Sequence, residues 1–116
     1  MIVICGDGKI PSKKNMMKIY KNRMYKHKTV RDFELRLSEL ARVEMKGRSP
    51  IVGDVRLVLS VTEGDKRRRD LQNYFGSVCD ALNKIVYDDD SQIIELIAEK
   101  CYIKNKFEYT ITIQSI

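Results

Sequence analysis

A chain of 116 residues has the length of one domain and can bury a modest hydrophobic core. Its residues are 43% hydrophobic and 33% charged, which is typical of a folded globular protein and not of a disordered one. The net charge of +6 favours phosphate-rich partners, and no apolar run is long enough to suggest a membrane span. The N-terminus lacks the pattern of a signal peptide, so we expect a cytoplasmic protein with residues 1–116 as a single domain.

The cysteines and the histidine exclude several kinds of site. Cys5, Cys79 and Cys101 are odd in number and widely separated, so they indicate neither a zinc site nor a disulfide framework. His27 is alone, which excludes a site that needs several histidines. We expect Cys79 in a helix and Cys101 in a strand to be buried as small apolar residues.

The first half of the chain changes from strand patterns to a helical pattern. Four segments are expected before residue 50: a strand and turn over 1–9, a basic polar loop over 10–15, a small hairpin within 19–25, and a helix over 29–45. The helix is predicted from five apolar residues at three- and four-residue spacing: Phe33, Leu37, Leu40, Ala41 and Met45.

The second half predicts three strands and a second helix. The segments are an alternating strand over 54–62, a helix over 70–84, an acidic loop over 88–90, a strand over 92–103, a turn over 104–106 and a last strand over 107–114. We expect the last strand to pair with the preceding one as a hairpin. The strand–helix–strand order predicts that 54–62 and 92–103 run parallel through a right-handed crossover. The fold class is therefore α+β, a two-layer α/β sandwich with two main helices on one face of a mixed sheet.

One stretch carries the chemistry that the sequence suggests. Four cations, Lys66 to Arg69, directly precede Asp70, and three carboxylates follow the second helix at 88–90. Grouped carboxylates hold hard cations such as Mg²⁺, which can polarise a phosphoryl oxygen and activate water, while arginines can hold phosphates bidentately. The plainer alternative makes Asp70 a helix cap neutralised by the arginines, and makes the acidic triplet a solvated turn.

The motifs of this stretch resemble a known family. RRRDLQN, followed by DAL and then DDSQI, is similar to the central motif of the RusA family of Holliday-junction resolvases. Residues 11–15, PSKKN, look like the N-terminal loop of that family, and a Tyr-rich hairpin follows. The resemblance covers nearly the whole chain. It implies a small homodimeric, Mg²⁺-dependent endonuclease, often phage-encoded, that binds four-way or other branched DNA in recombination and repair.

The resemblance assigns roles to individual residues. It implies catalytic carboxylates at Asp70, Asp89 and Asp90, and metal ligands at Asp70 and Asp90. Asp88 is a further candidate metal ligand, because the acidic loop of this chain is one carboxylate richer than the family pattern. It also implies DNA-binding residues in the N-terminal loop and around the basic run: Lys13, Lys14, Asn15, Lys66, Arg67, Arg68, Arg69 and Asn73.

Two positions depart from the family pattern. Gln72 stands where the family has a second Asp, and Gly76 stands where it has a catalytic Lys. Losing a carboxylate weakens Mg²⁺ binding. Losing the lysine removes a cation that could stabilise the negative charge developing in the reaction, an effect often worth about 10²–10³ in rate. Three interpretations stay open: an active nuclease with a modified site, a protein that binds branched DNA without cutting, and a fold that acts through protein partners. The retained basic run argues against the third.

Overall fold

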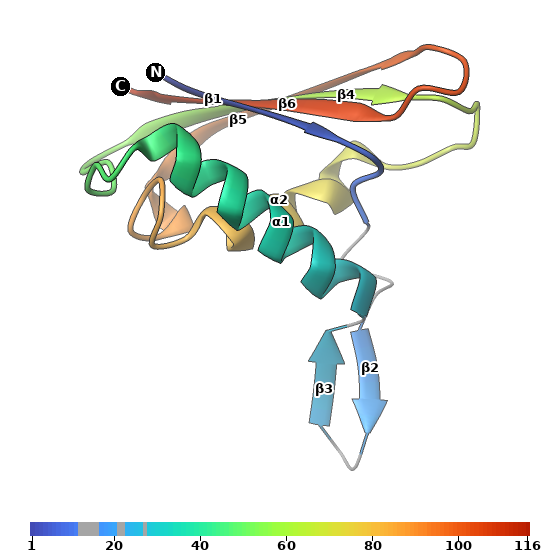
Figure 1. Ribbon diagram of the computed structural model, residues 1–116, viewed down its shortest axis with the longest axis horizontal. Helices are drawn as coiled ribbons and strands as arrows, with labels where there is room; N and C mark the ends of the chain where they lie inside the picture. Colours follow the sequence, from blue (N-terminus) through green and yellow to red (C-terminus); the bar gives the residue numbers. More distant parts are fainter. Residues whose placement is uncertain (12–16, 21–22, 27) are drawn as a thin grey trace.

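The computed structural model describes residues 1–11, 17–20, 23–26 and 28–116, with side chains for 1–11 and 28–116 (Figure 1). Its elements in chain order are β1 (Ile2–Asp7), β2 (Met17–Tyr20), β3 (Arg23–Lys26), α1 (Lys28–Met45), β4 (Val55–Glu63), the 3-10 helix η2 (Leu71–Tyr74), α2 (Phe75–Leu82), the 3-10 helix η3 (Asp90–Gln92), β5 (Ile93–Tyr102) and β6 (Glu108–Ser115). The predicted α+β class is confirmed. Of the helices that the structure describes, none combines the length and apolar character that crossing a bilayer requires.

A four-stranded mixed sheet forms one layer of the molecule, with strand order β1-β6-β4-β5. The central strand β4 pairs antiparallel with β6 and parallel with β5, so the predicted parallel crossover is confirmed. Figure 1 shows both helices beneath this sheet, as expected for a two-layer sandwich. The predicted hairpin is also present as β2 and β3, which pair antiparallel below the start of α1.

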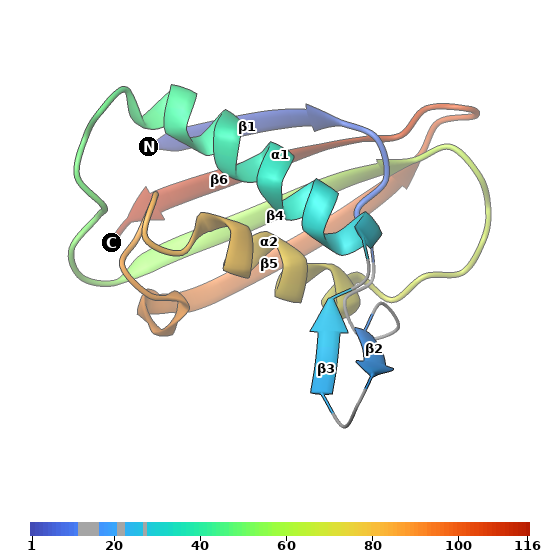
Figure 2. The same ribbon diagram turned by 60° about the horizontal axis from the view of Figure 1, so that its bottom comes forward.

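The expected hairpin between the last two strands is wrong. β6 follows β5 in the chain but pairs with β4 on one side and β1 on the other, so β5 is left at the edge of the sheet (Figure 2). Burial explains this order. Tyr109, Ile111 and Ile113 of β6 are almost fully buried, which a strand achieves most completely between two neighbours, whereas every side chain of β5 is exposed or half-buried.

The hydrophobic core lies between the sheet and the helices. Strand β4 alternates buried and half-buried side chains along its whole length, so one face of it packs against α1 and α2. Cys79 of α2 is buried, as expected, and the low polarity of its surroundings raises the pKa of its thiol to about 11. Cys101, however, is exposed, because it lies on edge strand β5; the expectation that it is buried is wrong.

The second predicted helix is shorter and less regular than its apolar pattern indicates. The segment begins as the 3-10 turn η2, continues as α2 and ends at Leu82, two residues before the predicted end. Asn83 is extended and Lys84 adopts a left-handed conformation with φ of 68°, which turns the chain out of the helix. The Tyr87 hydroxyl then donates to the Cys79 carbonyl at 2.9 Å, which fastens the returning chain against α2.

Candidate nucleic-acid and metal site

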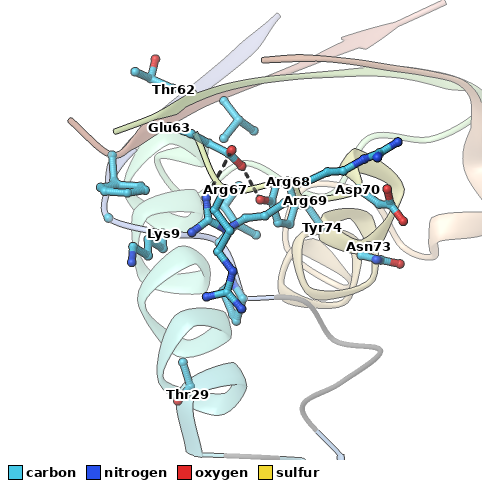
Figure 3. A pocket seen from close by; sticks show the side chains of 15 residues that line it. Lys9, Thr29, Thr62, Glu63, Arg67, Arg68, Arg69, Asp70, Asn73 and Tyr74 are labelled. Atoms are coloured by element: carbon cyan, nitrogen blue, oxygen red, sulfur yellow. Dashed lines mark hydrogen bonds and ion pairs between the residues drawn. The ribbon is translucent and has the colours of Figure 1, made fainter. Parts of the chain in front are cut away.

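A cleft of about 820 Å³ opens at the end of the molecule where β4 finishes (Figure 3). Its walls come from the chain after β1, the start of α1, the end of β4, the basic run, η2 and the turn before β6. The lining residues are Gly8, Lys9, Ile10, Pro11, Thr29, Val61, Thr62, Glu63, Arg67, Arg68, Arg69, Asp70, Asn73, Tyr74 and Phe107. Most of the basic run is therefore gathered with Asp70 and Asn73 around one hollow.

A buried carboxylate stands at the base of this cleft. Glu63 is the last residue of β4 and has the same strand phase as four buried residues, so the alternation of the strand carries it into the interior with 5% of its surface exposed. Its carboxylate accepts a short hydrogen bond from the Tyr74 hydroxyl and a longer one, 3.4 Å, from Arg69 Nη1 (Figure 3). The buried charge is thus satisfied by two partners from the following segment.

A second carboxylate holds the other side of Arg69. The guanidinium donates to both oxygens of Asp65, at 2.6 and 3.0 Å, in a bidentate pair. The hydrogen bond from Arg69 lowers the pKa of Asp65 to about 2, and the same contact raises the pKa of Arg69. Burial, and then the contact with Glu63, raises the pKa of Tyr74. Arg69 is therefore held by the protein's own acids and offers little free charge to a ligand.

This network was not predicted from the sequence. Arg69 was expected to bind phosphate, and no role was expected for Glu63, Asp65 or Tyr74. A signal was present: Glu63 continues the alternation that buries Val55 to Val61, and a buried carboxylate needs a cationic or hydrogen-bonding partner nearby.

The rest of the basic run faces solvent. Lys66, Arg67 and Arg68 are exposed, and the side chains of Arg67 and Arg68 have no hydrogen-bonding or ionic partner among the residues that the structure describes. Lys66 Nζ lies 5.3 Å from the centre of the Tyr102 ring, a distance suited to a cation–π contact. Arg67 and Arg68 are therefore accessible to a ligand at the rim of the cleft.

Asp70 is exposed beside them. It occupies the cap position of η2, but its side chain accepts no capping hydrogen bond, and within the described residues no arginine pairs with it. The alternative in which Asp70 is a neutralised cap therefore does not describe this structure. Asn73, one turn further, lies next to Asp70 at the same side of the cleft (Figure 3).

The acidic triplet is organised by a capping box. Asp89 accepts a hydrogen bond from the Ser91 amide at 3.0 Å, and Gln92 accepts bonds from the amides of Asp88 and Asp89 at 2.8 and 3.0 Å. The hydrogen bonds from Ser91 lower the pKa of Asp89. Gln92 also donates to the carbonyls of residues 51 and 53, which ties the loop to the chain before β4. Asp88 forms an exposed ion pair with Lys84 at 3.2 Å.

Asp70 and the triplet lie toward opposite ends of the β4–β5 pair. Asp70 shares its cleft with Glu63 at the end of β4, whereas Asp88 borders a separate hollow of about 420 Å³ beside residues 49–53, just before β4 starts. The eight steps from Val55 to Glu63 span about 26 Å at the rise of a strand. In the described part of the chain, no three acidic, histidine or cysteine side chains come together as a metal site. The carboxylates of one chain, arranged in this way, do not fit a magnesium ion.

The two departures from the family pattern lie on the surface. Gln72 and Gly76 are both exposed, at the start of the η2–α2 segment that follows Asp70. Lys13, Lys14 and Asn15, the candidates in the N-terminal loop, lie outside the described residues.

Comparison with known proteins identifies the family. A search of curated proteins found no match. A sequence model of the family described as endodeoxyribonuclease RusA, in contrast, matches residues 7–114, which include the residues that line the cleft, the basic run and the acidic loop. This match covers all but eight residues of the 116-residue chain, so the protein belongs to the RusA family of endodeoxyribonucleases.

Proposed function

We propose that this protein binds branched DNA, with four-way junctions as its first candidate, through the rim of the cleft at the end of β4. The observation that carries the proposal is the pair of exposed cations, Arg67 and Arg68, that line a hollow of about 820 Å³ together with Asn73, while exposed Lys66 directly precedes them in the chain. Exposed arginines suit phosphate oxygens because the guanidinium can form two parallel hydrogen bonds. The whole of residues 1–116 would act as one domain, with the N-terminal loop, Lys13 to Asn15, as a further DNA contact.

We propose further that the bound DNA is cut in a reaction that requires Mg²⁺, with Asp70, Asp89 and Asp90 as the catalytic carboxylates. Asp70 supports this role because it is exposed, has no partner in the described residues and stands next to the phosphate-binding cations. A bound metal would supply charge stabilisation for the phosphoryl group. The protein itself would hold and orient the phosphates through Arg67 and Arg68. Asp88 and Asp90 would be the remaining metal ligands, which requires that they approach Asp70 from another chain of a homodimer.

A second function, binding without cutting, is favoured by Gln72 and Gly76. Gln72 can offer a carbonyl oxygen but no charge, and Gly76 offers no cation. Both positions are exposed, so an Asp and a Lys there can be accommodated at the surface. Replacing Gly76 within α2 also raises helix propensity, by up to about 1 kcal/mol.

One experiment separates these functions. A labelled four-way junction is incubated with the protein in Ca²⁺ for binding and in Mg²⁺ or Mn²⁺ for cutting, with linear duplex of the same sequence as control. We expect retardation of the junction in every case. Paired nicks from the wild-type chain support the nuclease, whereas nicks only from Gln72→Asp with Gly76→Lys support binding without cutting. No retardation at low salt would overturn both functions.

The contribution of the rim is tested by salt dependence. Each phosphate neutralised contributes about −0.9 to the slope of log K against log salt, so Arg67→Ala should make the slope shallower by about 1. The matched control is Arg42→Ala. Arg42 is also exposed, but it lies 13 positions after Thr29, the residue at the start of α1 that lines the cleft. An equal effect of the two substitutions would show that general charge, and not the cleft, binds the DNA.

A further inference from the structure

The segment that carries the exposed arginines and Asp70 has no regular secondary structure. Residues 66–70 follow the bend after β4 and precede the 3-10 turn η2, so side chains must fix their path. On the β4 side, Asp65 accepts hydrogen bonds from the Arg67 amide, at 3.1 Å, and from the Arg69 guanidinium. Strand β5 holds the other side of the segment.

Two residues of β5 contact the two ends of the basic run. Lys66 Nζ, at the start of the run, lies 5.3 Å from the centre of the Tyr102 ring. Lys100 Nζ donates to the carbonyl of Arg69, at the end of the run, at 2.9 Å. That carbonyl belongs to the peptide group between Arg69 and Asp70, so this bond acts directly on the backbone of Asp70. Lys100 therefore holds the peptide from which Asp70 projects.

The parallel pairing of β4 and β5 brings Lys100 to this place. Both strands end on the side of the molecule where the cleft opens, and Lys100 is in register with Val61, which lines the cleft. Val61 is buried in the core, so Lys100 points to the same face of the sheet. Lys100 itself is exposed, because β5 is the edge strand. A lysine 31 positions beyond Arg69 thus reaches the site through strand pairing and not through local sequence.

Acidic side chains do not compete for Lys100 in the part of the chain that the structure describes. The adjacent carboxylate, Glu99, points to the other face of β5, where it accepts a hydrogen bond from Ser60 at 2.8 Å. A charged ammonium also bonds a carbonyl more strongly than a neutral donor does. The bond to Arg69 is therefore the interaction that orders the Lys100 side chain.

We propose that Lys100 is a positioning residue for the candidate DNA site. Its ammonium holds the peptide between Arg69 and Asp70, and this contact sets the direction in which Asp70, Arg67 and Arg68 face the bound phosphates (Figure 3). The proposal rests on the proposed function for its role in DNA binding. The ordering of the basic run by Lys100 does not depend on DNA.

The ordering of the basic run is tested without DNA, by limited trypsin digestion. Each residue of the run is a trypsin site, and cleavage after residues 66–69, followed by mass spectrometry, reports how often the segment opens. Lys100→Met keeps the length of the side chain and removes the donor, so it should speed this cleavage by about 3- to 10-fold. Lys100→Arg keeps a charged donor and should be cleaved at the wild-type rate.

The matched control is Lys46→Met. Lys46 is also exposed, directly after α1, and its substitution removes the same charge. Cleavage of the basic run in this variant should equal that of the wild type. Equal urea midpoints of the variants and the wild type would show that the segment, and not the whole fold, has opened. Unchanged cleavage of Lys100→Met, or equal acceleration in Lys46→Met, would overturn the proposal.

The role in DNA binding is tested by retardation of a labelled four-way junction. Lys100→Met should weaken binding by about 3- to 10-fold, because Arg67 and Arg68 then meet the phosphates from a looser segment. Lys100→Arg should bind like the wild type, and Lys46→Met should bind more tightly than Lys100→Met. Equal weakening by the two methionine variants would indicate a general loss of charge and overturn the positioning role. Retardation of no variant and no wild type would refute the proposed function instead, while the digestion would still decide whether Lys100 orders the basic run.

Discussion

Arg69→Ala should destabilise the fold, whereas Arg68→Ala should weaken DNA binding without affecting stability. The two arginines are neighbours in one basic run and look equivalent in sequence. In the structure, Arg69 joins Glu63 to Asp65, with its side chain 20% exposed, while Arg68 is exposed at the rim of the cleft. Truncating Arg69 leaves Glu63, whose side chain is 7% exposed, with Tyr74 as its remaining described hydrogen-bond partner.

The expected loss follows from burial and geometry. Removing one partner of a fully buried ion pair costs about 3–5 kcal/mol. Three features reduce this value: the bond from Arg69 to Glu63 is long at 3.4 Å, Tyr74 still donates, and Asp65 is 41% exposed and regains water. We therefore expect a loss of about 2–3 kcal/mol. For a domain of this size that loss lowers the melting temperature by about 8–12 °C.

The assay is urea unfolding followed by circular dichroism, with thermal unfolding alongside. Glu63→Gln in the Arg69→Ala chain removes the unpaired charge, so this double variant should be more stable than Arg69→Ala alone. Arg68→Ala should unfold at the same urea concentration as the wild type, and it should weaken junction binding. Equal stabilities of the Arg69→Ala and wild-type chains would refute the structural role of Arg69, and strictly additive effects of the Glu63 and Arg69 changes would refute their coupling.

Three further predictions follow from other contacts. Folding raises the pKa of Tyr74, so the folded state keeps a proton that the unfolded state releases, and the free energy of unfolding should fall as pH rises above about 10. Tyr74→Phe should remove the contribution of Tyr74 to that fall and should cost about 1.5–3 kcal/mol of stability at neutral pH. Urea unfolding measures both effects. Folding lowers the pKa of Asp65 to about 2, so its contribution should be lost as pH falls through that value, and Asp65→Asn should flatten the acid limb of the stability profile between about pH 4 and 2. Gly6→Ala would place a methyl group 2.2 Å from the Tyr109 ring and should cost about 1–3 kcal/mol, whereas Cys5→Ala, exposed on the same strand, should unfold like the wild type.

Local periodicity was sufficient to predict most elements of the fold. The alternation over 54–62 predicted β4 to within one residue, and the apolar spacing from Phe33 to Met45 predicted α1, because each pattern reports directly which side of an element is buried. The order of strand, helix and strand predicted the parallel β4–β5 pair. These patterns did not predict the end of α2 at Leu82, since the left-handed Lys84 that follows has no signal in its residue type.

The place of β6 depended on competition between strands. Adjacent strands joined by a short turn usually pair, which favoured β5 with β6. Burial decided the pairing. Three side chains of β6 are almost completely buried, which requires a neighbouring strand on each side of β6, whereas no side chain of β5 is buried to that extent. That outcome also decided the exposure of Cys101, which its apolar character alone did not indicate.

The sequence by itself determined the family, the fold class and the presence of cations and carboxylates in one stretch, because these depend on residue types and their spacing. Only the tertiary structure decided which charges are available. The phase of β4 carries Glu63 into the interior, so Arg69 is drawn into a protein network and the exposed Arg67 and Arg68 are left for phosphate. The helical segment between Asp70 and the acidic triplet keeps these carboxylates toward opposite ends of the β4–β5 pair. Residues close in sequence are separated here because a helix spans the distance between them.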